Sequence, residues 1–224
     1  MKTLLLAFTA LFSIVNPLSG AFVFFGATQG MDTRERALVS RWVSIYAFAI
    51  VTASLYVGAY VLEFFGISLP VLKVGGGIVV ALSGWRMLTG PDATEQRRSE
   101  TANALKPSVV PSRLAFYPLT MPLTTGPGTI SVAISVGSER PNGFGEQWLS
   151  FVFETVLAVA LLSLAVYICY RNSARLAAAI GVTGTTIVVR LSAFLLFCIG
   201  IQVFWNGASV LLASIGHPAV PGAG

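Results

Sequence analysis

Six long apolar segments, separated by short polar stretches, dominate the pattern of residues along the chain. They cover about residues 3–28, 37–65, 70–89, 111–137, 148–170 and 187–214. A helix needs about 20 apolar residues to cross the hydrocarbon core of a bilayer, and each segment is of that order. The pattern therefore predicts an all-α membrane protein with six transmembrane helices.

The polar stretches predict how these helices are grouped. The longest of them, "GPDATEQRRSETANALKP", lies between the third and fourth segments and divides the chain into two halves. We expect a first three-helix unit over residues 1–92 and a cytoplasmic loop over 93–110. A second three-helix unit then covers 111–214, and a loose tail covers 215–224.

Composition supports a chain that faces lipid and indicates its orientation. Of the 224 residues, 55% are hydrophobic and only 10% are charged, against about 25% charged in soluble domains. With six spans, only Lys2, Lys73 and Arg140 of the 14 basic residues fall on the side of the termini. The positive-inside rule therefore places both termini on the periplasmic side. No basic run interleaved with aromatic residues indicates a nucleic-acid partner.

Two of the predicted helices contain residues that interrupt helices. The first segment carries "NPLSG" at 16–20, and the fourth carries "MPLTTGPG" at 121–128 with Pro118 just before it. Proline costs about 3 kcal/mol and glycine about 1 kcal/mol inside a helix, so the residues 118–128 oppose a continuous helix by roughly 11 kcal/mol. We expect both segments to be broken, with the irregular backbone buried in protein or lining a cavity.

The two interruptions belong to a wider internal repeat. Both read Pro-Leu-hydroxyl followed by Gly, and both lie in the first helix of their half. The stretches "FGISLPVLKVGGG" at 65–77 and "IGVTGTTIVVRLSA" at 180–193 likewise join the second and third helices of each half. Because each half has three helices, the second copy is inserted upside down. This predicts two inverted three-helix repeats with broken first and fourth helices, an arrangement found in many transporters.

Broken helices expose backbone groups that can bind a solute. We expect Thr125 or Gly126 to cap a new helix, with its free N–H groups at residues 128–130, and Ser19 and Gly20 to offer N–H groups from the first break. Such helix N-termini favour a carboxylate, while free carbonyls and the Asn16 side chain accept from an ammonium group. The predicted substrate-binding residues are Asn16, Pro17, Ser19, Gly20, Thr124, Thr125, Gly126, Pro127, Gly128 and Thr129.

The substrate class follows from charge. No Lys, Arg, Asp or Glu lies near the middle of either broken segment, which favours a zwitterion with a small neutral side chain bound near the membrane midplane. The alternative interpretation is that the breaks only permit close helix packing, as small residues commonly do in membranes.

Other residues carry weaker predictions. Glu63 and Glu154 lie in apolar segments and are candidates for proton or sodium coupling, although Glu63 also fits an acid at the membrane interface. No other cofactor and no metal site is expected. Gly77 and Gly84 are one heptad apart and are predicted to pack closely against another helix. A Gly-xxx-Gly pattern at 26–30 is a weak indication of a homo-oligomer.

Three stretches, in the same order, resemble a known family. They are "NPLSG", "FGISLPVLKVGGG" with the following "SGWRML", and "PLTMPLTTGPGTISVAIS". Together they resemble the MarC family of six-helix inner-membrane proteins, over about residues 5–210. The resemblance implies inverted three-helix repeats, a location in the bacterial inner membrane, and transport of neutral amino acids such as glycine and alanine. Many relatives carry Gly where Ser19 stands.

The sequence thus predicts a secondary transporter of small neutral amino acids and leaves export open as its direction. The alternatives are a channel for small polar solutes and efflux of other small molecules. An enzyme is not expected, because the single histidine, His217, lies in the tail and both aspartates lie in loops. The expected partners are the amino acid and the lipid bilayer.

Overall fold

The computed structural model describes residues 1–28, 30–89, 115–141 and 145–216, and the regular secondary structure in this part of the chain is entirely helical. The predicted loop at 93–110 and the tail residues 217–224 lie outside it. In chain order the elements are α1 (Lys2–Val15), α2 (Pro17–Ala27), α3 (Thr33–Phe64), α4 (Leu69–Thr89), the π-helix η1 (Ala115–Thr124), α7 (Pro127–Ser138), α8 (Glu146–Arg171) and α9 (Ser173–Gly216).

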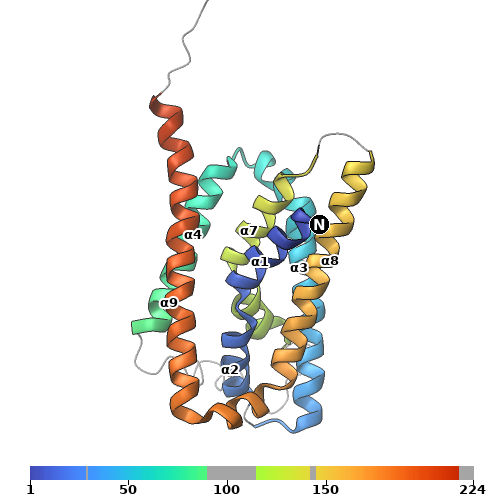
Figure 1. The fold of residues 1–224 in the computed structure, drawn as a ribbon, viewed down its shortest axis with the longest axis vertical. Helices are drawn as coiled ribbons and strands as arrows, with labels where there is room; N and C mark the ends of the chain where they lie inside the picture. Colours follow the sequence, from blue (N-terminus) through green and yellow to red (C-terminus); the bar gives the residue numbers. More distant parts are fainter. Residues whose placement is uncertain (29, 90–114, 142–144, 217–224) are drawn as a thin grey trace, which may run out of the picture.

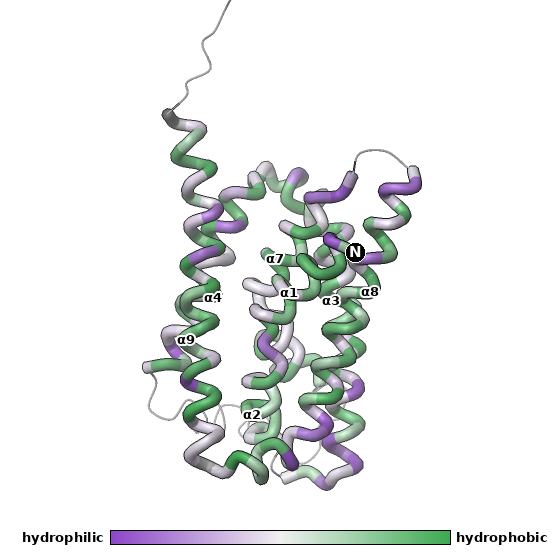
Figure 2. The backbone as a smooth tube through the Cα atoms, viewed as in Figure 1, coloured by the Kyte–Doolittle hydropathy of each residue, from purple (hydrophilic) through white to green (hydrophobic). Residues whose placement is uncertain are grey.

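Within the described residues, five stretches are long and apolar enough to cross a membrane: Lys2–Ala27, Thr33–Phe64, Leu69–Thr89, Glu146–Arg171 and Thr183–Ser214. The sixth predicted segment, 111–137, is not among them. Its described part is divided into η1, with 10 residues, and α7, with 12 residues, and each is too short to span a bilayer. Figure 2 shows hydrophobic residues along most of the length of the long helices.

The start of α3 shows how local sequence fixes a helix end. Asp32 is the N-cap: its side chain accepts from the Glu35 N–H, and the Glu35 side chain accepts from the Asp32 N–H. This capping box satisfies two donors that a helix start leaves free. The Arg36 guanidinium donates to Thr28 and to the Met31 carbonyl, which holds the end of α2 against the start of α3.

The prediction of a loop between the last two apolar segments, 148–170 and 187–214, is wrong. Residues after Ser173 are helical, and α9 reaches Gly216 with a kink at Gly181, whose φ of 73° is a conformation that glycine adopts easily. The stretch before the kink contains three consecutive alanines, which favour a helix. In Figure 1 this first part of α9 crosses below α2 before the helix turns upward.

Helices α4 and α9 form a closely packed pair. A Cβ placed at Gly77 would lie 2.3 Å from the backbone of Phe204, and one at Gly84 would lie 2.5 Å from that of Phe197. A Cβ at Gly200 would lie 2.3 Å from Ala81. The prediction that Gly77 and Gly84 permit close packing against another helix is therefore confirmed. Figure 1 shows this α4–α9 pair on one side of the protein.

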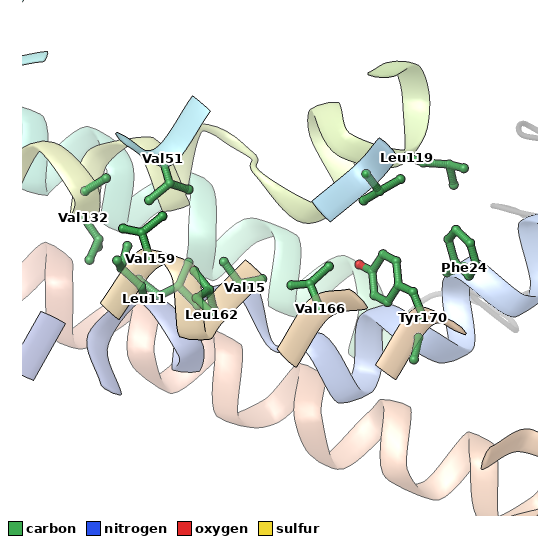
Figure 3. Packing of buried hydrophobic residues seen from close by; sticks show 14 of the residues in the cluster. Leu11, Val15, Phe24, Val51, Leu119, Val132, Val159, Leu162, Val166 and Tyr170 are labelled. Atoms are coloured by element: carbon green, nitrogen blue, oxygen red, sulfur yellow. The ribbon is translucent and has the colours of Figure 1, made fainter. Parts of the chain in front are cut away.

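The other helices form a second body around a buried core. Helices α1 and α2 pack against α8, while η1 and α7 pack against α3. Figure 3 shows the core side chains between them, including Leu11 of α1, Val51 of α3 and Leu162 of α8. Each interrupted segment therefore packs on the long helix of the other half of the chain. The α4–α9 pair meets this body mainly through α7 and α2.

Candidate functional site

The first interruption is a single residue, Asn16. Its backbone adopts the left-handed conformation, with φ 45° and ψ 65°, which asparagine tolerates better than most residues. The Asn16 N–H ends α1 by bonding to the Phe12 carbonyl at 2.9 Å. Pro17, which has no N–H, opens α2. The last carbonyls of α1 therefore lack the donors that a continued helix would supply.

Asn16 also accepts hydrogen bonds from backbone N–H groups that follow it in the chain. Its Oδ1 accepts from the Ser19 N–H at 3.3 Å, and its carbonyl accepts from the Gly20 N–H at 3.0 Å. The expectation that these two N–H groups are free for a solute is therefore wrong, because the Asn16 side chain and carbonyl accept one hydrogen bond each from them. What remains at this interruption is the Ser19 hydroxyl and the carbonyl end of α1.

The second interruption is longer and begins inside η1. Tyr117 and Met121 have extended backbones, with ψ 127° and ψ 123°, and each precedes a proline, which disfavours helical conformation in the preceding residue. Threonine hydroxyls bridge the widened turns. Thr120 donates to the Ala115 carbonyl at 2.6 Å, and Thr124 donates to the Leu119 carbonyl at 2.8 Å.

The helix that follows this interruption, α7, starts without a side-chain cap. Gly126 is its N-cap, with φ −75° and ψ 175°, and Pro127 occupies its first turn, as the sequence predicts. The Ile130 N–H bonds to the Gly126 carbonyl at 3.1 Å, so Ile130 is not the free donor expected. Among the described residues, none accepts a hydrogen bond from the N–H of Gly128 or Thr129.

One cavity, called here the central cavity, brings the two interruptions together. Its volume is 430 Å³, within the roughly 300–1,000 Å³ range typical of ligand sites. Of the ten predicted site residues, eight line it: Asn16, Ser19, Gly20, Thr124, Gly126, Pro127, Gly128 and Thr129. Pro17 and Thr125 do not, and both are buried. The other wall of the cavity comes from α4 and α9.

The lining of the central cavity is largely uncharged. Ser19 is 3% exposed, and its hydroxyl has no hydrogen-bond partner among the described residues. Such a buried hydroxyl is costly unless something binds it. The one ionisable side chain in this described lining is Arg86 of α4, which the sequence reasoning did not assign to the site. Its spacing from Val79, Val80 and Ser83 places these residues on one helix face, but only the fold shows that this face meets the interruptions.

A second cavity of 790 Å³ lies near the start of α1 and is called here the terminal cavity. It is lined by charged side chains of both signs: Lys2, Lys73, Glu139, Glu146 and Glu154. Glu154 is ion-paired with the N-terminal amine and accepts from the Leu4 N–H at 3.0 Å. Glu63, the other predicted coupling residue, is exposed at the end of α3 and lines neither cavity.

The contact between α4 and α7 separates the two cavities. A Cβ at Gly128 would lie 2.1 Å from Val80 Cγ2, and one at Gly76 would lie 2.2 Å from Ser131 Oγ. The Ser131 hydroxyl donates to the Leu72 carbonyl at 3.2 Å. Gly128 faces the central cavity and Ser131, one turn later, lines the terminal cavity. These close contacts on α7 therefore form a barrier between them.

Comparisons with known proteins identify a family of integral membrane proteins. The family described as "MarC family integral membrane protein" matches residues 1–212. The inner membrane protein MarC of Salmonella paratyphi A is 34% identical over 211 residues, covering 92% of this chain and 94% of the relative.

The inner membrane protein MarC of Citrobacter koseri is 34% identical over 208 residues, with the same coverage of both chains. That of Escherichia coli O139:H28 is 34% identical over 211 residues, again with 92% and 94% coverage. No solved structure matches the chain significantly. The chain therefore belongs to the MarC family of integral membrane proteins.

Proposed function

We propose that this protein is a secondary transporter of small neutral α-amino acids, such as glycine and alanine, which bind in the central cavity. The observation that carries the proposal is that two helix interruptions, far apart in the sequence, line one cavity. That cavity contains an unpartnered buried hydroxyl, and its described lining has no acidic side chain. A zwitterion matches the positive and negative backbone ends that the interruptions create.

The two interruptions suggest an orientation for the bound solute. The N–H groups of Gly128 and Thr129, at the positive end of α7, bind the carboxylate. The carbonyls at the end of α1, at its negative end, accept from the ammonium group, and the Ser19 hydroxyl adds one further hydrogen bond. Backbone groups of this kind bind a dipolar solute without a buried counter-charge.

The arrangement of helices supports an inverted repeat of two three-helix units, with α1–α2 and η1–α7 as corresponding spans. Each interrupted span packs on the long helix of the other half. The third helices pack on each other through glycines at equal spacing, Gly77 and Gly84 on α4 and Gly200 and Gly207 on α9. In this arrangement the arginine-rich loops are cytoplasmic and both termini are periplasmic.

The same geometry suggests how access alternates. Both cavities lie between the α4–α9 pair and the body that contains the interruptions. Movement of the pair along α7 would close one cavity and open the other, since the Gly128–Val80 and Gly76–Ser131 contacts separate them. Glu154, in the terminal cavity, is then the better of the two candidates for proton or sodium coupling.

Counterflow in proteoliposomes tests this function. Vesicles preloaded with unlabelled alanine are diluted into labelled alanine, and we expect transient, saturable accumulation that Gly128→Leu abolishes. The matched control is Gly75→Leu, because a Cβ at Gly75 meets nothing within 4 Å. Flux that rises linearly with concentration and shows no counterflow would instead indicate a channel. Absence of flux for every small neutral amino acid would contradict the proposal.

A further inference from the structure

Tyr170, in the last turn of α8, is fully buried and has no role in the site described above. Its ring stacks on Phe24 of α2, with ring centroids 4.7 Å apart and planes 24° apart. Figure 3 shows the two rings side by side at one end of the core. The side chain of Tyr170 therefore connects α8, a helix without interruption, to the second half of the first interrupted span.

The hydroxyl of Tyr170 also contacts the second interrupted span. It lies 2.9 Å from Thr124 Oγ1. The single proton of the Thr124 hydroxyl is donated to the Leu119 carbonyl at 2.8 Å, so Tyr170 is the donor in the bond between the two hydroxyls. Thr124 is the last residue of η1, so this bond holds the residue at which η1 ends.

The same hydroxyl lies directly against the first turn of α2. A Cβ placed at Gly20 would be 2.5 Å from the Tyr170 hydroxyl oxygen and 3.2 Å from two ring carbons. Only glycine leaves room for Tyr170 at this position. One oxygen atom therefore contacts both interrupted spans, at Gly20 and at Thr124.

Gly20 and Thr124 line the central cavity, whereas Tyr170 lies behind them and does not line it. We propose that Tyr170 is a positioning residue that fixes the separation of the two interruptions, and with it the distance between the groups that bind the carboxylate and the ammonium. The inference rests on the proposed function, because it concerns the affinity of the same cavity for its solute.

The chain contains a matched control for this role. The Tyr56 hydroxyl of α3 lies 2.7 Å from Thr155 Oγ1 of α8, and Thr155 donates to the Phe151 carbonyl at 2.8 Å. This is the same tyrosine-to-threonine chemistry on the same long helix. Neither Tyr56 nor Thr155 lines the central cavity or belongs to an interrupted span.

The test compares Tyr170→Phe with Tyr56→Phe in the full chain. We expect small shifts in thermal unfolding for both, since each loses the hydrogen bonding of one tyrosine hydroxyl: Tyr170 with Thr124, and Tyr56 with Thr155 and the Val152 carbonyl. Only Tyr170→Phe should raise the KM for alanine counterflow, by about five- to tenfold, with kcat much less affected. Thr124→Val should raise KM similarly, and the double variant should add little, because both remove the same bond. Equal KM values for Tyr170→Phe and the parent protein would overturn the inference.

A second readout does not depend on any solute. In a background where Cys169 and Cys198 are replaced by Ala, Ser19→Cys reports access to the central cavity through its rate of reaction with a small methanethiosulfonate reagent. We expect Tyr170→Phe to change this rate several-fold and Tyr56→Phe to leave it unchanged. If the parent shows no flux, the proposed function fails, but this rate still decides whether Tyr170 positions the interruptions. An unchanged rate in Tyr170→Phe would overturn the positioning role.

A reciprocal substitution tests the contact with Gly20. Gly20→Ala should lower the thermal stability and the reactivity of the Ser19→Cys reporter, because the added methyl group collides with the Tyr170 hydroxyl. Combining it with Tyr170→Phe removes the closest of the colliding atoms, so we expect partial recovery of both. Identical defects with and without Tyr170→Phe would count against the contact.

Discussion

The two interruptions end one helix and start the next in different ways. At the first, one left-handed asparagine ends α1 and caps α2 with its own side chain and carbonyl. At the second, prolines extend the backbone over several residues, threonine hydroxyls satisfy the widened turns, and α7 starts at a glycine that has no side chain with which to cap it.

This difference indicates a division of roles. The first interruption uses its N–H donors internally, so its sequence mainly stabilises a sharp break. The second leaves the N–H groups of Gly128 and Thr129, two residues that line the central cavity, without a described acceptor. We therefore expect loss of the Asn16 cap at the first interruption to lower stability, and substitution of Gly128 at the second to lower solute affinity.

The largest effect is expected for Gly128→Leu. The side chain would collide with Val80, whose Cγ2 is 2.1 Å from the Cβ position, and would cover the uncapped end of α7. Loss of two hydrogen bonds to a charged carboxylate, at about 1.5 kcal/mol each, lowers alanine affinity roughly 100-fold. Isothermal titration calorimetry of the purified protein in detergent measures this. Gly75→Leu should bind as the parent does, and equal losses in the two variants would show that the effect is not local.

Asn16→Ala should mainly destabilise the fold. The variant loses the cap of α2, worth about 1 kcal/mol, and forces alanine into a left-handed conformation at about 1–2 kcal/mol. Asn16→Gly keeps the conformation open and loses only a few tenths of a kcal/mol as a cap. Thermal unfolding in detergent should therefore rank the parent close to Asn16→Gly, with Asn16→Ala well below. The reverse order would contradict a structural role for Asn16.

Ser19→Ala should separate affinity from stability. It removes a buried hydroxyl that has no partner among the described residues, so the free protein should unfold at the same temperature or slightly higher. Alanine affinity should fall by about five- to tenfold, the value of one hydrogen bond. Ser163→Ala removes another buried hydroxyl without a described partner, outside both cavities. It should leave affinity unchanged; a loss of affinity there as large as in Ser19→Ala would remove the case for a direct contact.

The smallest effect is expected for Glu63→Gln, since Glu63 is exposed and lines neither cavity. The transport rate of Glu63→Gln should stay within about twofold of the parent.

Glu154→Gln, in the terminal cavity, should weaken the dependence of flux on an imposed proton or sodium gradient. Measuring counterflow and gradient-driven flux in the same vesicles compares the two variants. A gradient defect in Glu63→Gln alone would reverse the assignment.

Much of the site follows from local sequence. The prolines after Tyr117 and Met121 predict extended backbone there, and "NP" at 16–17 predicts the end of α1. The sequence does not show as easily which backbone N–H groups at the interruptions stay without a hydrogen-bond acceptor. The Asn16 side chain accepts from the Ser19 N–H because the Asn16 backbone is left-handed. The presence of helix-breaking residues alone does not specify that conformation.

The sequence does not predict contacts between helices that are far apart along the chain. Arg86 lines the central cavity because α4 packs beside α7, and Tyr170 of α8 contacts both interrupted segments. Nothing in the residues around either one indicates these contacts. The glycines and threonines after Ser173 are typical of a loop, so the sequence does not predict the helix there. In the structure, Gly181 only introduces a kink in α9.

Amide hydrogen exchange, read by mass spectrometry at single-residue resolution, tests the central claim most directly. In the free protein, the amides of Gly128 and Thr129 should exchange rapidly, while those of Ser19 and Gly20 are protected by Asn16. Saturating alanine should slow exchange at Gly128 and Thr129 and leave Ser19 and Gly20 nearly unchanged. Protection of all four amides before alanine is added, or no change at Gly128 and Thr129 with alanine bound, would contradict the account.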